Sequence, residues 1–380
     1  MTCPSCEQTT PEGRFCIRCG APLADDWEGK SRTRSHFAAA SHQHVAHPAL
    51  ISTLFPHLPR ASQSGFRLAL AFGLAVVAGL AALRLFPMAL IAAALLLPLL
   101  VVLYLIDVDV YEGEPPWAVA FVILWGAVAG VGFGLLAIDV APSAVDVIAH
   151  GDSQNVVQQG LLLPFAGLLV LLIGPVLLLP YHRFNDVLDG VTFGTAAAAA
   201  FGGAQAITYG VHYFGSGVRP AGAIAPWIWR LLSLGLGMPI VTMGAAAAAC
   251  AALWLRYRAP ARDCEALGPA GHPVVALPLA AALVMGAAVG ETFLPPWGWL
   301  LWLAAFDVVV IIMLRRAIHV GLLEEALEIP IGPEIACPNC GAQTARHTFC
   351  GNCGISLQAL PKTRPRRSEP VAMPASEPPA

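Results

Sequence analysis

Long apolar stretches separated by short polar segments make up most of the chain from residue 66 onward. Each stretch has close to the ~20 residues that a helix needs to cross the ~30 Å hydrocarbon core of a bilayer. They cover residues 66–84, 87–106, 117–138, 157–179, 188–212, 226–255, 273–294 and 297–314. The pattern predicts an all-α polytopic membrane bundle of about eight transmembrane helices, with the lipid bilayer as its first partner.

Composition supports a membrane protein and argues against a nucleic-acid partner. Hydrophobic residues make up 57% of the 380 positions and charged residues 12%, whereas soluble domains carry roughly 25% charged residues. The formal net charge is −3, and the basic residues gather at the two ends and in a few loops. Because no broad basic face is present, we expect no nucleic acid to bind.

Two cysteine blocks flank the apolar region, CPSCEQTTPEGRFCIRCG at 3–20 and CPNCGAQTARHTFCGNCG at 337–354. Each contains two C-x-x-C pairs separated by nine residues, with phenylalanine and glycine at matching places, so the blocks are an internal duplication. Paired C-x-x-C turns bring four thiolates to one tetrahedral zinc ion, and units this short fold only with the metal. This is the most specific motif in the sequence.

We therefore predict one structural Zn²⁺ in each block, held in small β zinc ribbons over residues 1–24 and 332–358. A redox dithiol and disulfides are the alternatives that the spacing leaves open. Both blocks resemble the short single or double zinc ribbons of many bacterial and archaeal proteins, whose exposed loops bind protein partners. The predicted metal ligands are Cys3, Cys6, Cys16, Cys19, Cys337, Cys340, Cys350 and Cys353.

Thiolate ligands require a reducing compartment, which predicts that both termini lie in the cytoplasm. An even number of spans is needed for that topology, in agreement with the hydrophobic pattern. The excess of arginine and lysine on the same side of the predicted spans agrees with it too. Because no apolar signal-peptide core precedes residue 60, we expect the first span to direct membrane insertion.

The segments between the ribbons and the predicted bundle, and after the second ribbon, lack hydrophobic periodicity. Residues 25–62 are interpreted as a flexible linker and residues 359–380 as a disordered tail, leaving 63–318 as the membrane domain. The linker contains His36, His42, His44 and His47. We interpret these histidines as linker residues in preference to a metal site, because flexible His-rich segments often bind metal only adventitiously.

The span at 188–212 carries polar side chains and several glycines. Gln205 and Tyr209 lie four residues apart, on one face of a helix, and Gly194 and Gly202 allow close approach of neighbouring helices. Polar side chains in hydrocarbon are costly and normally face a bundle interior. Taken alone, this face is typical of polar contacts within a tightly packed bundle.

The same stretch resembles the PrsW-type intramembrane proteases, which are related to the CAAX-processing membrane proteases. In that family a span opens with Asp-Gly, continues with an aromatic-Gly step and a Phe, and ends with Glu-Asn-x-x-Tyr. This chain keeps the spacing with Asp189-Gly190, Phe193-Gly194, Phe201, Gln205-Ala206 and Tyr209. Upstream it has Glu114-Pro115, Phe121 and Trp125-Gly126-Ala127, and downstream it has Arg230. The resemblance covers about residues 105–255 and implies a bacterial inner-membrane protein.

The residues that the family uses for chemistry are replaced in this chain. The resemblance implies paired glutamates where Ala166 and Gly167 stand, or Gln158 and Gln159 in a shifted alignment. Gln205 occupies the position of a glutamate. Amides do not accept a proton at neutral pH and are poor metal ligands.

One further family position has lost its chemistry, since Met238 stands where the resemblance implies a histidine. The landmarks that remain are Asp189, Gly190, Tyr209 and Arg230. Among the other ionisable residues of the spans, we expect Asp307 to pair with Arg230, because an unpaired charge inside a bilayer is expensive. The polar residues of the span at 188–212 thus look inherited from a protease site whose catalytic groups are gone.

Three hypotheses follow. The first is a proteolytically inactive, PrsW-like bundle that binds a membrane or cytoplasmic partner, with the ribbons as cytoplasmic interaction modules. The second is a divergent active protease that uses Asp189, Asp307 or His212 in place of the lost groups. The third is a transporter or channel subunit, which is disfavoured because the membrane half shows no internal repeat.

Overall fold

The structure is a computed structural model. It describes residues 1–4, 8–18, 20–23, 60–108, 116–140, 156–219, 224–259, 264–328, 330–337, 339–354 and 357. The predicted tail and the linker up to residue 59, including its four histidines, lie outside the described residues. Cys6 and Cys19 of the first cysteine block also lie outside them.

Helices account for nearly all of the described chain between the two cysteine blocks. In chain order they are α3 (Arg60–Ala82), α4 (Phe86–Val108), α5 (Pro116–Val140), η1 (Val156–Leu162), α8 (Leu163–Leu178), α9 (Val187–Tyr213), η2 (Phe214–Ser216), α10 (Ala225–Leu232), η3 (Ser233–Gly237), α11 (Met238–Tyr257), η4 (Cys264–Gly271), α12 (Pro273–Phe293) and α13 (Pro296–Glu328). Segments η1 and η3 are π-helical turns that run directly into α8 and α11.

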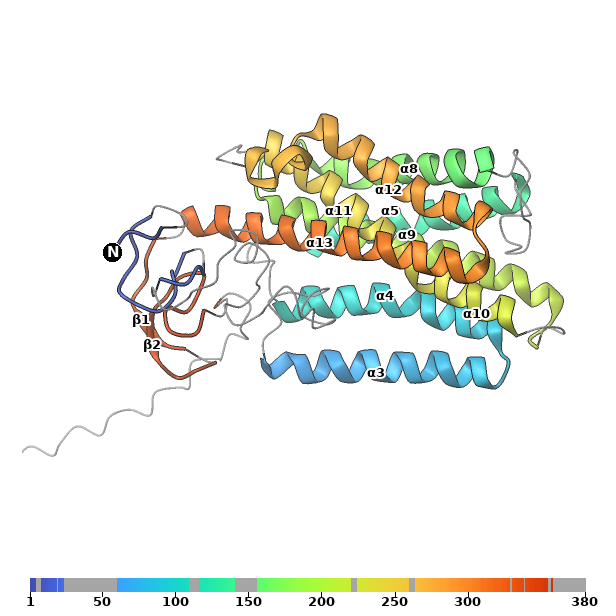
Figure 1. Ribbon diagram of the computed structural model, residues 1–380, viewed down its shortest axis with the longest axis horizontal. Helices are drawn as coiled ribbons and strands as arrows, with labels where there is room; N and C mark the ends of the chain where they lie inside the picture. Colours follow the sequence, from blue (N-terminus) through green and yellow to red (C-terminus); the bar gives the residue numbers. More distant parts are fainter. Residues whose placement is uncertain are drawn as a thin grey trace, which may run out of the picture.

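These helices agree with the predicted membrane bundle. In the described part of the chain, seven helical segments are long and apolar enough to cross a membrane, and Phe66–Ala82 forms a shorter apolar helix. Together they cover all the stretches predicted from the hydrophobic pattern. The successive spans run in opposite directions, so the two cysteine blocks lie at the same end of the bundle (Figure 1).

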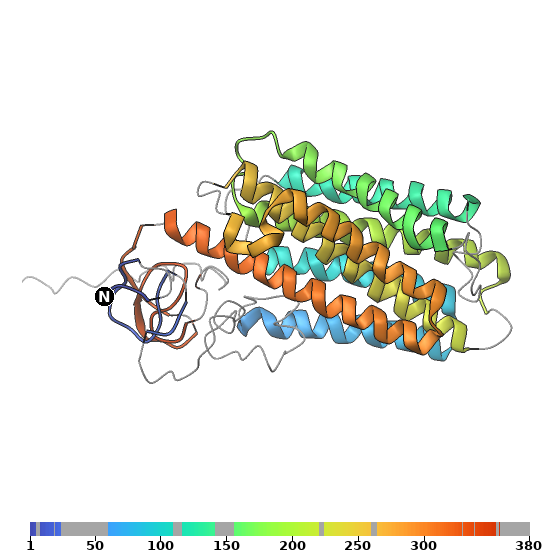
Figure 2. The same ribbon diagram turned by 45° about the horizontal axis from the view of Figure 1, so that its top comes forward.

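Helix α9 lies at the centre of the bundle and is almost wholly buried. It packs against α4, α5, α8, α11 and α13. Its many alanines and glycines make this possible, because small side chains allow helix backbones to approach closely. By contrast, α13 exposes much of its length, as expected of a helix that faces lipid, and reaches past the bundle toward the cysteine blocks (Figure 2).

A glycine stripe on α5 fixes its contact with α9. Gly126 and Gly130 are one helical turn apart, and a Cβ on either would collide with the carbonyl oxygen of Ala197 or Phe201. On the other side of α9, a Cβ on Gly194 would lie 2.8 Å from the Ala246 oxygen of α11. The helices therefore meet backbone to backbone, which is the basis of the close packing in the bundle.

The start of α9 is fixed by a capping box. Asp186 is the N-cap residue, and its backbone N–H donates to the Asp189 carboxylate at 3.0 Å. Such reciprocal bonds satisfy amide groups that the first helical turn leaves without a partner. Asp189 thus has a structural role at the N-terminal end of α9.

The two cysteine blocks form a small unit beside the C-terminal end of α13 (Figures 1 and 2). In the second block, β1 (Glu334–Ala336) and β2 (Gln343–Ala345) pair antiparallel, with Ile335 opposite Thr344. The first block has isolated bridges between Thr2 and Thr9 and between Phe15 and Pro22. Small β structure in the two terminal cysteine blocks, next to a helical bundle, agrees with the prediction.

Candidate metal centre and bundle cavity

The second cysteine block brings all four of its predicted ligands together. The sulfur atoms of Cys337, Cys340, Cys350 and Cys353 lie within 4.8 Å of one another. The Sγ atoms of Cys337 and Cys353 are 3.8 Å apart, and those of Cys340 and Cys350 are 3.9 Å apart. The structure records these four cysteines as free thiols, without a disulfide among them.

The donor set fits a tetrahedral metal ion. Zinc–sulfur bonds of about 2.3 Å in a tetrahedron place the sulfurs about 3.8 Å apart, which matches the two distances between sulfurs. Amide groups support two of the sulfurs, because Asn339 Nδ2 donates to Cys353 Sγ at 3.5 Å and Asn352 Nδ2 to Cys340 Sγ at 3.6 Å. Such outer hydrogen bonds orient metal ligands. The block could therefore hold one metal ion through its four thiolates.

The surroundings of two thiols set their protonation in the metal-free block. Burial raises the pKa of Cys337 to about 12. Burial acts in the same direction on Cys340, but hydrogen bonds from the Ala342 N–H and the Asn352 amide outweigh it and lower the pKa to about 7. Since the metal binds thiolates, its binding must release protons from this block.

The first cysteine block repeats the backbone geometry of the second. The Cys3 N–H donates to the Gln8 oxygen at 3.0 Å, as the Cys337 N–H donates to the Ala342 oxygen at 2.8 Å. The Gly20 and Gly354 N–H groups likewise donate to the oxygens of Cys16 and Cys350.

Side-chain bonds and backbone angles repeat as well. Thr10 Oγ1 accepts from the Ile17 N–H at 3.4 Å, as Thr344 Oγ1 accepts from the Gly351 N–H at 2.9 Å. Gly20 and Gly354 share a positive φ of 69° and 66°, a conformation that favours glycine. The duplication inferred from sequence is thus a duplication of structure.

The two blocks pair through equivalent residues. Phe15 N–H donates to the Gly351 oxygen at 2.9 Å, and Phe349 N–H donates to the Ile17 oxygen at 2.8 Å. Phe15 matches Phe349 in the duplication, and Ile17 matches Gly351, so the same bond occurs twice about an approximate two-fold axis. Equivalent surfaces meeting in this way are typical of isologous dimers. The pairing joins the two ends of the chain.

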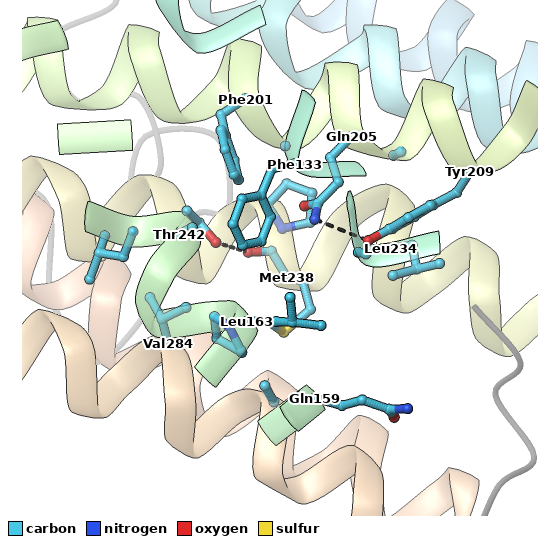
Figure 3. A pocket seen from close by; sticks show the side chains of 18 of the residues that line it. Phe133, Gln159, Leu163, Phe201, Gln205, Tyr209, Leu234, Met238, Thr242 and Val284 are labelled. Carbon is cyan, nitrogen blue, oxygen red and sulfur yellow. Dashed lines mark hydrogen bonds between the residues drawn. The ribbon is translucent and has the colours of Figure 1, made fainter. Parts of the chain in front are cut away.

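The helical bundle contains a cavity of about 120 Å³ between α5, η1, α8, α9, η3, α11 and α12 (Figure 3). Its wall is mainly apolar, with Phe133, Phe201, Leu163 and Val284 among the lining residues. Two polar residues of α9 lie on one wall, where Gln205 Nε2 donates to the Tyr209 hydroxyl at 3.0 Å. The predicted shared face of Gln205 and Tyr209 is therefore present, and it faces the cavity.

Most of the positions at which the resemblance implies catalytic groups meet at this cavity. Gly167, Gln205 and Met238 line it, as does Gln159 of the shifted alignment. Residues from four separate segments of the chain thus converge on one site, although they carry no proton-transfer or metal-binding groups. Ala166 is not a lining residue and packs against the hydrophobic core instead. Gln158, the other residue of the shifted alignment, is exposed.

The retained landmarks other than Tyr209 lie away from the cavity wall. Asp189 caps α9, and Gly190 packs on α11, where a Cβ would lie 2.8 Å from the Cys250 oxygen. The Arg230 guanidinium lies 4.9 Å from the Tyr213 ring centroid and 4.8 Å from that of Trp227. These residues position helices and aromatic rings.

The expected pair between Asp307 and Arg230 is not formed. Asp307 Oδ1 is buried and has no hydrogen-bond partner among the described residues. Arg230 lies instead against aromatic faces, a favourable position for a guanidinium. His212, a candidate for divergent catalysis, is exposed and contacts the Tyr213 ring edge-on.

Two lining residues were missed by the sequence reasoning. Glu291 of α12 and Thr242 of α11 both line the cavity. Nothing in the sequence shows that α12, which carries Glu291, closes the cavity. The π-helical turns η1 and η3 at the cavity were also missed, and such turns are frequent at functional sites.

Metal-binding side chains are sparse in the bundle. In the ranges that the structure describes, the Cys337–Cys353 cluster is the single place where three or more His, Cys, Asp or Glu side chains could share an ion. At the cavity, Glu291 is the one carboxylate among the lining residues. Comparison with known proteins adds no assignment, because no family model, curated protein or solved structure matches the chain.

Proposed function

We propose that this chain is a multi-pass membrane protein with a PrsW-like, proteolytically inactive bundle that binds a partner, and that its paired zinc ribbons are the cytoplasmic interaction module. The observation that carries the proposal is the convergence of Gln159, Gly167, Gln205 and Met238 on one cavity. A hydrolase of this kind needs a metal or a pair of carboxylates to activate water. Amide, thioether and glycine side chains supply neither.

The ribbons bind two zinc ions, one in each block. What supports the second ion is the repetition of hydrogen bonds and glycine angles in the first block, where Cys3 and Cys16 are buried as in a metal-bound ribbon. Structural zinc replaces the hydrophobic core that units of this size lack. Because thiolates persist in reducing compartments, the ribbon end of the bundle faces the cytoplasm of a bacterial inner membrane.

A proteolysis assay tests the inactive bundle. The purified full chain in detergent is incubated with fluorescently labelled single-span membrane peptides, beside the variants Gln205→Ala and Glu291→Gln. The proposal expects no cleavage by any of the three proteins. Cleavage by the natural chain that is abolished in either variant would contradict it and would favour a divergent protease.

A cross-linking experiment tests partner binding by the ribbons. A photo-crosslinking residue replaces the exposed Glu12 in the first ribbon, and a matched probe replaces the exposed Leu301 on α13. In cells, we expect a protein adduct from the Glu12 probe that disappears when Cys350→Ser removes a metal ligand. Adducts that persist without the metal ligand would contradict the proposed module.

A further inference from the structure

The polar side chains Thr242, Gln205 and Tyr209 in the cavity wall leave hydrogen-bonding groups for a ligand. Thr242 Oγ1 donates its proton to the Met238 carbonyl at 2.8 Å. The hydroxyl oxygen of Thr242 can therefore act toward the cavity only as an acceptor. Gln205 Nε2 donates to the Tyr209 hydroxyl at 3.0 Å, which leaves the amide oxygen of Gln205 as an acceptor turned away from Tyr209 (Figure 3). The Thr242 and Gln205 oxygens can accept from a ligand, and the Tyr209 hydroxyl, which accepts from Gln205, keeps its own proton to donate.

The cavity also contains one carboxyl group and no basic side chain. Glu291 lines it, and none of the lining residues, all in the described part of the chain, is basic. A carboxylate in a membrane interior is costly unless it is paired. A positively charged group from outside the chain would provide the missing partner.

Aromatic rings complete this environment. Phe133 and Phe201 line the cavity, and their ring centroids are 6.0 Å apart with the planes tilted. Aromatic faces attract cations, most strongly in sites that exclude water. The volume of about 120 Å³ is close to that of engineered cavities that hold benzene. The space suits one small molecule with an apolar body.

The geometry points to a binding site for a small primary ammonium compound, with its charged group at Glu291 and its apolar body between Phe133, Phe201 and Met238. The ammonium supplies three donors, and the acceptors that line the cavity include the carboxylate and the oxygens of Gln205 and Thr242. The π-helical turns η1 and η3 border the same cavity and shape its wall. This site is independent of the ribbons and of whether the bundle cuts peptides.

Calorimetry on the full chain in detergent tests the site with benzylamine as the probe and benzyl alcohol as its neutral match. We expect benzylamine to bind at least about tenfold more tightly than benzyl alcohol, because a charged hydrogen-bonded pair replaces a neutral contact. Glu291→Gln should remove this preference. Asp307→Asn, which changes a carboxylate that does not line the cavity, should leave it unchanged.

Several outcomes would overturn the assignment. They are equal binding of the two probes, no binding of benzylamine, an unchanged preference in Glu291→Gln, or full displacement of benzylamine by sodium or potassium ions. Should Glu291→Gln fail to yield a folded protein, Thr242→Val provides a second test. That variant removes one acceptor and should weaken benzylamine several-fold while benzyl alcohol binds as before.

Discussion

The C-terminal ribbon and the bundle cavity differ in what their converging residues can do. In the ribbon, four cysteines meet with sulfurs 3.8 and 3.9 Å apart, and every predicted ligand is present. In the cavity, positions from distant segments also meet, but as Gln205, Gly167 and Met238. Backbone packing through small residues such as Gly130 holds the helices around the cavity together. The positions that converge there can therefore be held in place without side chains that bind metal or transfer protons.

The largest effect is expected from removing one cysteine of the C-terminal ribbon, which tests its difference from the bundle cavity most strongly. Cys350→Ser should abolish zinc binding in the C-terminal block and unfold it, since structural zinc contributes on the order of 10 kcal/mol to such units. The measurement is metal analysis of the purified chain combined with limited proteolysis. Cys264→Ser, outside the cluster, is the control and should keep its zinc. A full zinc content in Cys350→Ser would contradict the assigned ligand.

The bundle should respond to backbone packing and not to metal. Gly130→Ala places a methyl group against the Phe201 carbonyl oxygen, so we expect a loss of about 1–3 kcal/mol in the free energy of unfolding. Gly132→Ala is the matched control, because a Cβ there has no neighbour within 4 Å. Unfolding in mixed detergent measures both. Equal stability of the two variants would show that α5 does not approach α9 closely.

Acidification should release metal from the ribbon and leave the bundle folded. The metal-bound form carries thiolates, whereas the pKa of Cys337 is raised to about 12 and that of Cys340 is lowered to about 7 in the metal-free block. Zinc affinity therefore rises with pH, and it falls more steeply below pH 7, where Cys340 also takes up a proton. Zinc titration with a competing chelator from pH 6 to 8 measures this pH dependence of the affinity. A flat profile would argue against thiolate ligands.

The smallest expected effect concerns the contact between the ribbons. A Cβ on Gly13 would lie 2.9 Å from the Gly351 oxygen, so Gly13→Ala should loosen the pair without touching a cysteine. Hydrogen exchange at Phe15 and Phe349 should become about tenfold faster, while the zinc content stays the same. Glu12→Ala, an exposed neighbour, should exchange as the natural chain does. Unchanged exchange in Gly13→Ala would mean that the two ribbons fold independently.

Much of this architecture is predictable from sequence because it is periodic or repeated. The apolar stretches predicted the helices that are long and apolar enough to cross a membrane, and the C-x-x-C spacing predicted the four-cysteine cluster from Cys337 to Cys353. The pairing of the ribbons was not predictable, since no local pattern states that Phe15 will bond to a residue more than three hundred positions away. Such contacts depend on where the helices bring the chain ends.

The cavity was predictable only in part for the same reason. The resemblance directed attention to Gln205 and Met238, which do line it. Glu291 lies on α12, whose place against α8 and η1 follows from tertiary packing alone. The expected pair between Asp307 and Arg230 is not formed, and the guanidinium lies against the rings of Tyr213 and Trp227.

The most direct test of the account is the zinc content of the natural chain beside a variant with all eight ribbon cysteines changed to Ser and the four linker histidines to Ala. The account predicts about two zinc ions in the natural chain and none in the variant, because the ribbons alone hold metal. One ion that persists in the variant would contradict it. The bundle would then hold a metal site and with it the means for hydrolysis.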